Sequence, residues 1–292
     1  MLTIVLGLST ALVYGFADFF GAIGSKRARP FFVSAFAAMG GLIVLSTVTL
    51  VGIGQAHFDE TIIFWGFIGG LASAFGLSCL YAALAIGPIS ILSPLSALIS
   101  AIVPAVVGIA QGDSFTWMGW LALALVLVAV VLVGFVPGDD VRLPSAKGLL
   151  LGVGAGVGIG VVLIALNQAA LSPNAVASDL GAVIIIRAMN GGILLAAAAI
   201  MMLLKKASPK ELKNLGAKFW AVVIAAGACD AAANVLFVNA LASGSFTVVS
   251  VLTALYPSGT ILLAYIVLKE RIARTQLLGI VLALGASVLL SV

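Results

Sequence analysis

The sequence predicts an all-α polytopic membrane protein, in which ten transmembrane helices form two inverted five-helix repeats around a central cavity. Three observations support this prediction: the composition, the number of long apolar windows, and an internal repeat. Of the 292 residues, 63% are hydrophobic and only 8% are charged. A soluble domain of that composition would lack the charged residues that its surface needs, so the sequence excludes an ordinary soluble fold.

Ten apolar windows are long enough for helices that cross a membrane, which takes about 20 residues each. Short alternating segments, the pattern of transmembrane β-strands, are not evident. The windows are 2–24, 31–53, 62–86, 89–110, 117–136, 147–168, 180–204, 219–242, 246–268 and 275–292.

The internal repeat pairs residues 70–113 with residues 227–270 at a constant offset of 157, without a gap. Eleven of the 44 aligned positions are identical, and eight of those lie in Ala83–Leu98 and Ala240–Leu255. Each copy predicts an apolar helix, a short turn and a second apolar helix. Such a repeat indicates that the chain is built from two related units.

The longest polar break in the middle of the chain lies between these units. It divides the sequence into a first repeat at 1–136, a linker at 137–146 and a second repeat at 147–292. Each repeat contains five windows, an odd number, so the second repeat enters the membrane from the opposite side. Two related units of opposite orientation are the plan of many secondary transporters.

The charges in the loops are separated by sign. Thirteen of the 14 Lys and Arg residues lie in loops on one side of the predicted membrane, and Arg187 lies inside a window. The opposite loops contain no Lys or Arg but hold Asp59, Glu60, Asp113 and Asp179. Because basic loops stay in the cytoplasm, the charges predict a multi-pass protein of the cell (inner or plasma) membrane with both termini outside.

Three ionisable residues lie inside the windows: Asp18, Arg187 and Asp230. An ionisable group in the hydrocarbon is costly, so each is a candidate for substrate binding or for coupling to an ion. Asp230 is at the predicted midpoint of its helix, which is the depth of many transporter sites. The alternative is a structural Asp–Arg pair that fixes how the helices pack.

Other candidate cavity residues are placed by helical spacing. Tyr14 lies one turn before Asp18, and Asn234 lies one turn after Asp230, so each shares a face with its neighbour. Tyr256 is a further candidate. Tyr14, Asn234 and Tyr256 could instead serve only in helix packing.

Ser93 and Ser250 occupy equivalent repeat positions on two hydroxyl-bearing stripes. They are candidate cavity residues, although hydroxyls of this kind often bond a carbonyl of their own helix. Pro94, Pro104 and Pro257 lie within the same windows, and we expect helices to bend there.

A set of residues in the second repeat follows a known pattern. It comprises Arg187, Ala240-Leu241, Ser250-x-Leu252-x-x-Leu255-x-Pro257, Leu262-Leu263-Ala264, Leu268-x-Glu270, Gly279 and Gly285. With these residues the second repeat resembles the EamA-type domain of the drug/metabolite transporter superfamily. The first repeat matches more weakly, through Tyr14-Gly15 and Ser93-x-Leu95.

The resemblance implies ten helices around a central cavity, and export or exchange of small metabolites, amino acids or drugs. It also implies cytoplasmic termini, opposite to what the charges predict, so both orientations stay open. The sequence contains no GxxxxGK[ST] ATP-binding pattern. We therefore expect alternating access driven by an ion gradient or by exchange.

Two other function classes, an intramembrane enzyme and a channel, fit the sequence less well. An intramembrane enzyme lacks support, because the sequence has neither HExxH nor GxSxG and only one histidine. A channel would favour rings of like polar groups, which two dissimilar repeats do not suggest.

We expect no enzymatic activity, no cofactor and no metal. The expected partners are a small-molecule substrate and the lipid bilayer, without nucleic acid; the oligomeric state is open and includes a monomer.

Overall fold

The computed structural model describes every residue except 87–88, 136–143, 176–178, 205–214, 270 and 291–292. The predicted turn at Gly87-Pro88, most of the predicted linker and Glu270 therefore lie outside the described residues. Within the described residues, the chain consists of α-helices and connecting segments, without a β-strand. The all-α prediction is confirmed.

The helices follow the predicted windows. Nine segments of the described chain are long and apolar enough to cross a membrane, and α10 with α11 forms one of them. The tenth, α12, has 16 residues, fewer than the ~20 of a typical span. The helices are α1 (Leu2–Ser25), α2 (Pro30–Leu50), α3 (Glu60–Ile86), α4 (Ile89–Ala110), α5 (Trp117–Gly134), α6 (Ala146–Ala170), α7 (Gly181–Leu203), α9 (Ala217–Leu241), α10 (Phe246–Thr253), α11 (Pro257–Leu268) and α12 (Arg274–Leu289).

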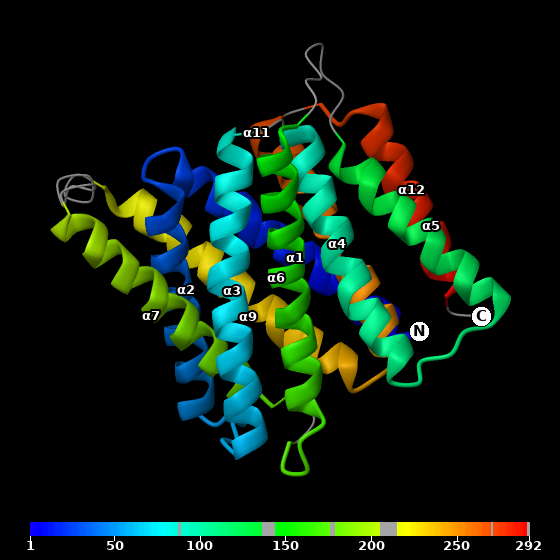
Figure 1. Cartoon of the computed structure of the whole chain (residues 1–292), viewed down its shortest axis with the longest axis horizontal. Helices are drawn as coiled ribbons and strands as arrows, with labels where there is room; N and C mark the ends of the chain where they lie inside the picture. Colours follow the sequence, from blue (N-terminus) through cyan, green and yellow to red (C-terminus); the bar gives the residue numbers. More distant parts are fainter. Residues whose placement is uncertain (87–88, 136–143, 176–178, 205–214, 270, 291–292) are drawn as a thin grey trace.

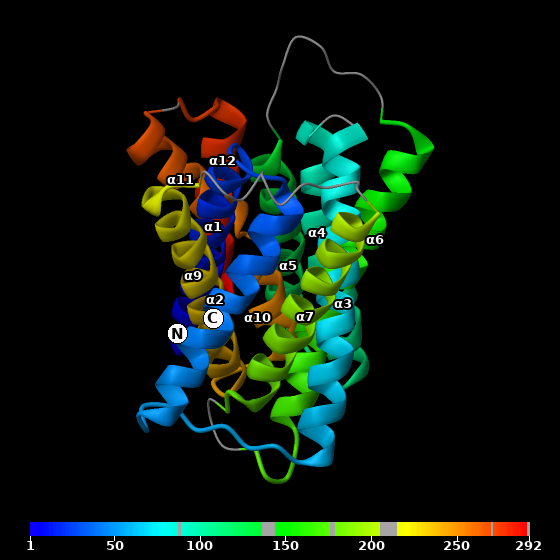
Figure 2. The ribbon, with the colours of Figure 1, turned by 90° about the vertical axis from the view of Figure 1, so that its left-hand side faces the viewer.

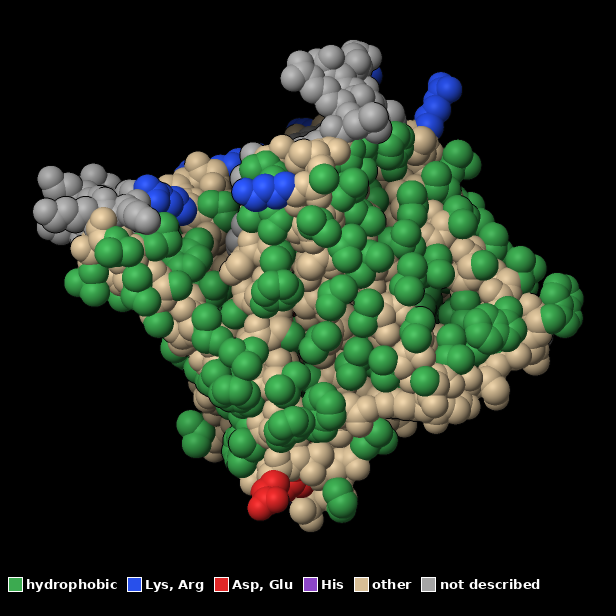
Figure 3. Space-filling model, viewed as in Figure 1, with side chains coloured by type: hydrophobic (Ala, Val, Ile, Leu, Met, Phe, Trp, Pro, Cys, Tyr) green, Lys and Arg blue, Asp and Glu red, His purple; other side chains and the backbone are tan. Residues whose placement is uncertain are grey.

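The helices form one bundle whose connections lie at two opposite ends (Figures 1 and 2). Figure 3 shows Lys and Arg side chains gathered at one end and acidic side chains at the other, with a mostly hydrophobic surface between them. We name these the basic end, which carries Lys26 and Lys147, and the acidic end, which carries Asp59 and Asp113. The hydrophobic surface between the ends is the part that faces lipid.

The packing of the helices relates the two repeats by an approximate twofold axis. If α1–α5 are matched in order with α6, α7, α9, α10–α11 and α12, then the main contacts occur in exchanged pairs. Thus α3 packs on α6 as α9 packs on α1, and α3 packs on α7 as α9 packs on α2. α1 begins at the acidic end and α6 at the basic end (Figure 2), so the repeats are inverted as predicted.

Glycines allow the helix backbones of different repeats to touch. A Cβ atom on Gly227 would lie 2.1 Å from the carbonyl oxygen of Ala37, closer than any real contact. Small residues permit such crossings in membranes, where packing rather than the hydrophobic effect holds helices together. The crossings are Gly41 with Gly227, Gly76 with Gly158, and Gly15 with Gly259.

One predicted helix is interrupted. The window 246–268 contains α10 and α11, separated by a tight turn at Ala254–Tyr256. The N–H groups of Leu255 and Tyr256 still bond carbonyls three residues earlier, so the turn leaves them satisfied. Pro257 then begins α11, a position where its missing N–H has no cost. By contrast, α4 continues through Pro94 and Pro104, so only Pro257 coincides with a break.

The crossing of α2 and α9 gives a test of the fold. We expect Gly227→Ala to lower the stability of the protein by about 1–3 kcal/mol, because the added methyl group forces the two backbones apart. The matched control is Gly192→Ala at an exposed position of α7, where an added Cβ meets nothing within 4 Å. Melting curves of the purified variants in detergent measure both effects. Equal melting temperatures for Gly227→Ala and the wild type would contradict the close crossing.

Candidate functional site

A cavity of about 1060 Å³ lies between the two repeats. Lys26, Pro30 and Gln276 line it at the basic end, and Arg187 and Asp230 line it near the middle of α7 and α9. Among the described residues, no acidic-end loop contributes to its wall. The cavity therefore runs from the basic end to the middle of the bundle and stops there. Its volume suits a drug-sized ligand.

An ion pair between Arg187 and Asp230 joins α7 to α9 in the cavity wall. Nη1 of the arginine contacts Oδ2 of the aspartate. The arginine side chain is 8% exposed and the aspartate side chain 28%, so the carboxylate faces the cavity and the guanidinium lies behind it. Each charge depends on the other, because removing one partner leaves the second buried without compensation.

Asp18 faces the same cavity from α1. Its side chain is exposed to the cavity space although the residue lies within a spanning helix. It makes no hydrogen bond or ion pair with the part of the chain that the structure describes. It is close enough to Asp230 and Tyr256 to interact with them electrostatically. Tyr14 also lines the cavity and is within electrostatic range of both aspartates.

Two asparagines flank the ion pair. Asn234 donates from Nδ2 to the backbone carbonyl of Asp230 at 2.7 Å, and Asn190 donates to the hydroxyl of Ser73 at 2.9 Å. Ser73 and Asp230 are equivalent positions of the repeat. α7 therefore contacts both equivalent positions, reaching one with Arg187 and the other with Asn190. The amide oxygens of both asparagines are buried without a partner among the described residues.

The two predicted serines have different environments. Ser93 lines the cavity, whereas Ser250 is fully buried, is absent from the wall, and has a hydroxyl without a partner in the described structure. Asn190 and Gln276 also line the cavity and were not among the predicted site residues. Asn190 could have been found from its position three residues after Arg187, on the same helix face. Gln276 lies too near a helix end for the sequence to distinguish it from a loop residue.

The acidic end is closed by polar contacts between the repeats. Nδ1 of His57 lies 2.5 Å from Oδ2 of Asp179, and the His57 backbone N–H donates to the same carboxylate at 3.1 Å. Asp59 accepts a hydrogen bond from the hydroxyl of Ser172. This bond and the backbone N–H of Ile62 lower the pKa of Asp59, so its carboxylate stays charged at neutral pH. From the sequence, Asp59 and Asp179 were identified only as acidic residues of the loops.

Asp113 makes a third contact of this kind. Its carboxylate accepts from the Ser245 hydroxyl at 2.8 Å and from the Thr247 N–H at 2.9 Å, at the start of α10. A carboxylate at a helix N-terminus is favourable, because it meets free N–H groups. We name the acidic-end latch as the three contacts His57–Asp179, Asp59–Ser172 and Asp113–Ser245.

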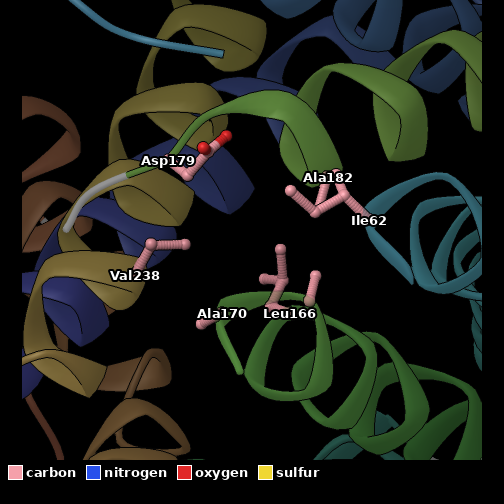
Figure 4. A pocket seen from close by; sticks show the side chains of 7 residues that line it. Ile62, Leu166, Ala170, Asp179, Ala182 and Val238 are labelled. Atoms are coloured by element: carbon pink, nitrogen blue, oxygen red, sulfur yellow. The ribbon is translucent and has the colours of Figure 1, made fainter. Parts of the chain in front are cut away.

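The space under the latch is too small for a ligand. Figure 4 shows Asp179 beside a void bounded by Ile62, Leu166, Ala182 and Val238. The void measures about 10 Å³, near the least that holds one water molecule. Of these two spaces among the described residues, only the cavity at the basic end has room for a ligand.

The site can bind a polar or charged solute and can hold protons on its two carboxylates. The described residues contain no group of three or more His, Cys, Asp or Glu side chains that could bind a metal ion. The arrangement has two carboxylates, one covered guanidinium and several amides and hydroxyls around a large space. These features fit a binding site in which ligand contacts are made and released.

Comparisons with known proteins give the family. The model of the EamA-like transporter family matches residues 1–135 and again residues 146–292. No curated protein matches. Among 29 matching chains of solved structures, one protein crystal structure has a TM-score of 0.77 over 99% of this chain and 98% of its own, at 16% identity, which shows the fold alone. The chain belongs to the EamA-like transporter family, whose members are membrane transporters of the drug/metabolite transporter superfamily.

Proposed function

We propose that the protein is a secondary transporter that exports or exchanges small metabolites, amino acids or drugs by alternating access. The observation that supports it most directly is the cavity that reaches the Arg187–Asp230 pair from one end only. A carrier needs a central site that opens to one side at a time. A channel would need a continuous polar pore instead.

The acidic-end latch would be the closed gate of this state. Each of its contacts joins a residue before the linker to a residue after it, so the repeats cannot separate at the acidic end while the contacts hold. Rocking the two repeats would break the latch and close the basic end. The turn at Ala254–Tyr256 lies beside the cavity and supplies a place where the second repeat can bend.

The two cavity carboxylates would couple transport to a proton gradient. Asp18 is reached from the cavity and has no partner in the described structure, so it can gain and lose a proton as the solute binds. Asp230 would hold the site together through Arg187 while contributing part of its carboxylate to the cavity. This assignment gives the two aspartates different roles.

The first test separates a structural from a functional role of the ion pair. Asp230→Asn strands the buried Arg187 charge, and we expect it to reduce stability by about 3–5 kcal/mol. The double variant Asp230→Asn/Arg187→Gln removes both charges and should regain most of that loss. Neither variant should carry out gradient-driven transport in proteoliposomes. The solute for this assay is the one that most raises the melting temperature in a screen of amino acids, amines and common metabolites.

Asp18→Asn is the matched variant in the same assay, because it removes a carboxylate that has no partner to strand. We expect it to melt near the wild type and to lose proton-coupled transport. Full coupled transport by the stable double variant would reduce the ion pair to a packing element. Coupled transport by Asp18→Asn would remove that residue from the coupling step.

The second test concerns the latch. In a background without Cys79 and Cys229, the pair Asp59→Cys/Ser172→Cys places two thiols where the native side chains touch. We expect the oxidised pair to block transport, because the disulfide holds the acidic end closed, while ligand binding from the basic end persists. A reducing agent should restore transport, and each single cysteine variant should be insensitive to oxidation. Transport through the crosslinked protein would rule out the latch as a gate.

The third test concerns orientation. The charge asymmetry favours a cytoplasmic basic end, since basic loops are retained there. Ala146→Cys at the basic end and Ser114→Cys at the acidic end are both exposed positions. In intact cells, an impermeant thiol reagent should label the cysteine at 114 and not the one at 146. The reverse labelling pattern would place the termini in the cytoplasm.

A further inference from the structure

Two acidic and two basic side chains line the cavity, and the more exposed charges near its middle are the negative ones. Asp18 is exposed to the cavity space, and the Asp230 side chain is 28% exposed. The positive charge that the described residues place near them, Arg187, is 8% exposed and paired with Asp230. Lys26 lies at the mouth of the cavity, two turns from Asp18 along α1. A ligand that reaches the middle of the bundle therefore meets carboxylate oxygens before it meets the guanidinium.

Neutral groups around the pair add hydrogen-bond acceptors. The amide orientation of Asn234 is fixed, because its Nδ2 must donate to the carbonyl oxygen of Asp230. Its Oδ1 is therefore an acceptor without a donor among the described residues, as is Oδ1 of Asn190. Both residues line the cavity and are only 1% exposed. Among the described residues, Nε of Arg187 and the hydroxyl of Thr253 are the buried donors of the cavity wall without a partner, and the arginine side chain is only 8% exposed.

Aromatic side chains complete the surroundings. Tyr14 and Tyr256 line the cavity, and both are within electrostatic range of Asp18. A cation near the face of an aromatic ring is attracted by the ring quadrupole. Carboxylates, amide oxygens and phenols together favour a positively charged donor. A carboxylate ligand would lie against Asp18 and would need an arginine that Asp230 already occupies.

We propose that the solute carried by this cavity is a small organic ammonium ion, whose N–H groups bind the Asp18 carboxylate beside Asp230 and Asn234. This inference deepens the transporter function and rests on it. Asp18 is the main contact, because it is both accessible and without a partner in the described structure. Hydrogen bonds from a charged donor to a carboxylate are short and stronger than neutral ones, so the N–H groups matter as well as the charge.

Four probes of similar shape test the proposal: 2-phenylethylamine, its N,N,N-trimethyl derivative, 3-phenylpropionate and 2-phenylethanol. Binding to the purified full-length protein is measured by calorimetry. We expect the primary amine to bind at least tenfold more tightly than the other three, since hydrogen bonds to charged groups are each worth on the order of ten- to hundredfold in affinity. Asp18→Asn should weaken the amine by a similar factor, and Asp18→Glu should retain part of the affinity.

Glu60→Gln is the matched control, because it makes the same change at an exposed position of the acidic end. It should bind the amine like the wild type. Equal binding of the carboxylate, the alcohol or the trimethyl compound would overturn the proposal, as would failure of the amine to bind or unchanged binding by a folded Asp18→Asn. Transport of a different solute in proteoliposomes would then leave the transporter function standing. Amine binding without transport of any solute would instead contradict the transporter function alone.

Discussion

The absence of water in the hydrocarbon is the constraint on which the structure depends. Backbone groups in lipid must bond within their own helix, which excludes an open sheet and makes every span helical. Many polar side chains of the spans fall into one of two groups under this constraint. One group bonds its own helix, as the hydroxyls of Thr10, Ser78 and Ser287 do with carbonyls four residues earlier. The other group, which includes Asp18 and Asp230, faces the cavity.

That constraint explains why the sequence predicted the fold so well. Apolar windows predict the membrane-spanning helices directly. Because each repeat has an odd number of spans, the sequence also predicts that the two repeats have opposite orientations in the membrane. The same logic singled out Asp18, Arg187 and Asp230, because a charge in lipid has few tolerable places. The structure puts all three in one cavity wall and pairs two of them.

What the sequence could not predict depends on contacts between distant residues. His57 and Asp179 are 122 positions apart, and Asp59 and Ser172 are 113 apart. Polar residues in loops have water as an alternative partner, so their identity alone does not indicate which of them pair. A bend was expected at Pro257, but the hydropathy did not show that the helix is interrupted at Ala254–Tyr256. The N–H groups of Leu255 and Tyr256 bond carbonyls three residues earlier, so the turn needs no additional polar residue and the window stays apolar.

The unequal chemistry of the two repeats has an energetic consequence. Ser73 of the first repeat is equivalent to Asp230 of the second, and Ser100 is equivalent to Pro257. If the repeats were identical, exchanging their conformations would convert the state open at one end into a state of equal free energy open at the other. The empty protein would then spend half its time in each state. Sequence differences such as these make the free energies of the two states unequal. A difference of only ~1.4 kcal/mol makes one resting state tenfold more populated. With such an imbalance, the cavity of the empty protein would open mostly to one side of the membrane. The gradient would then be needed to drive the change to the less populated conformation.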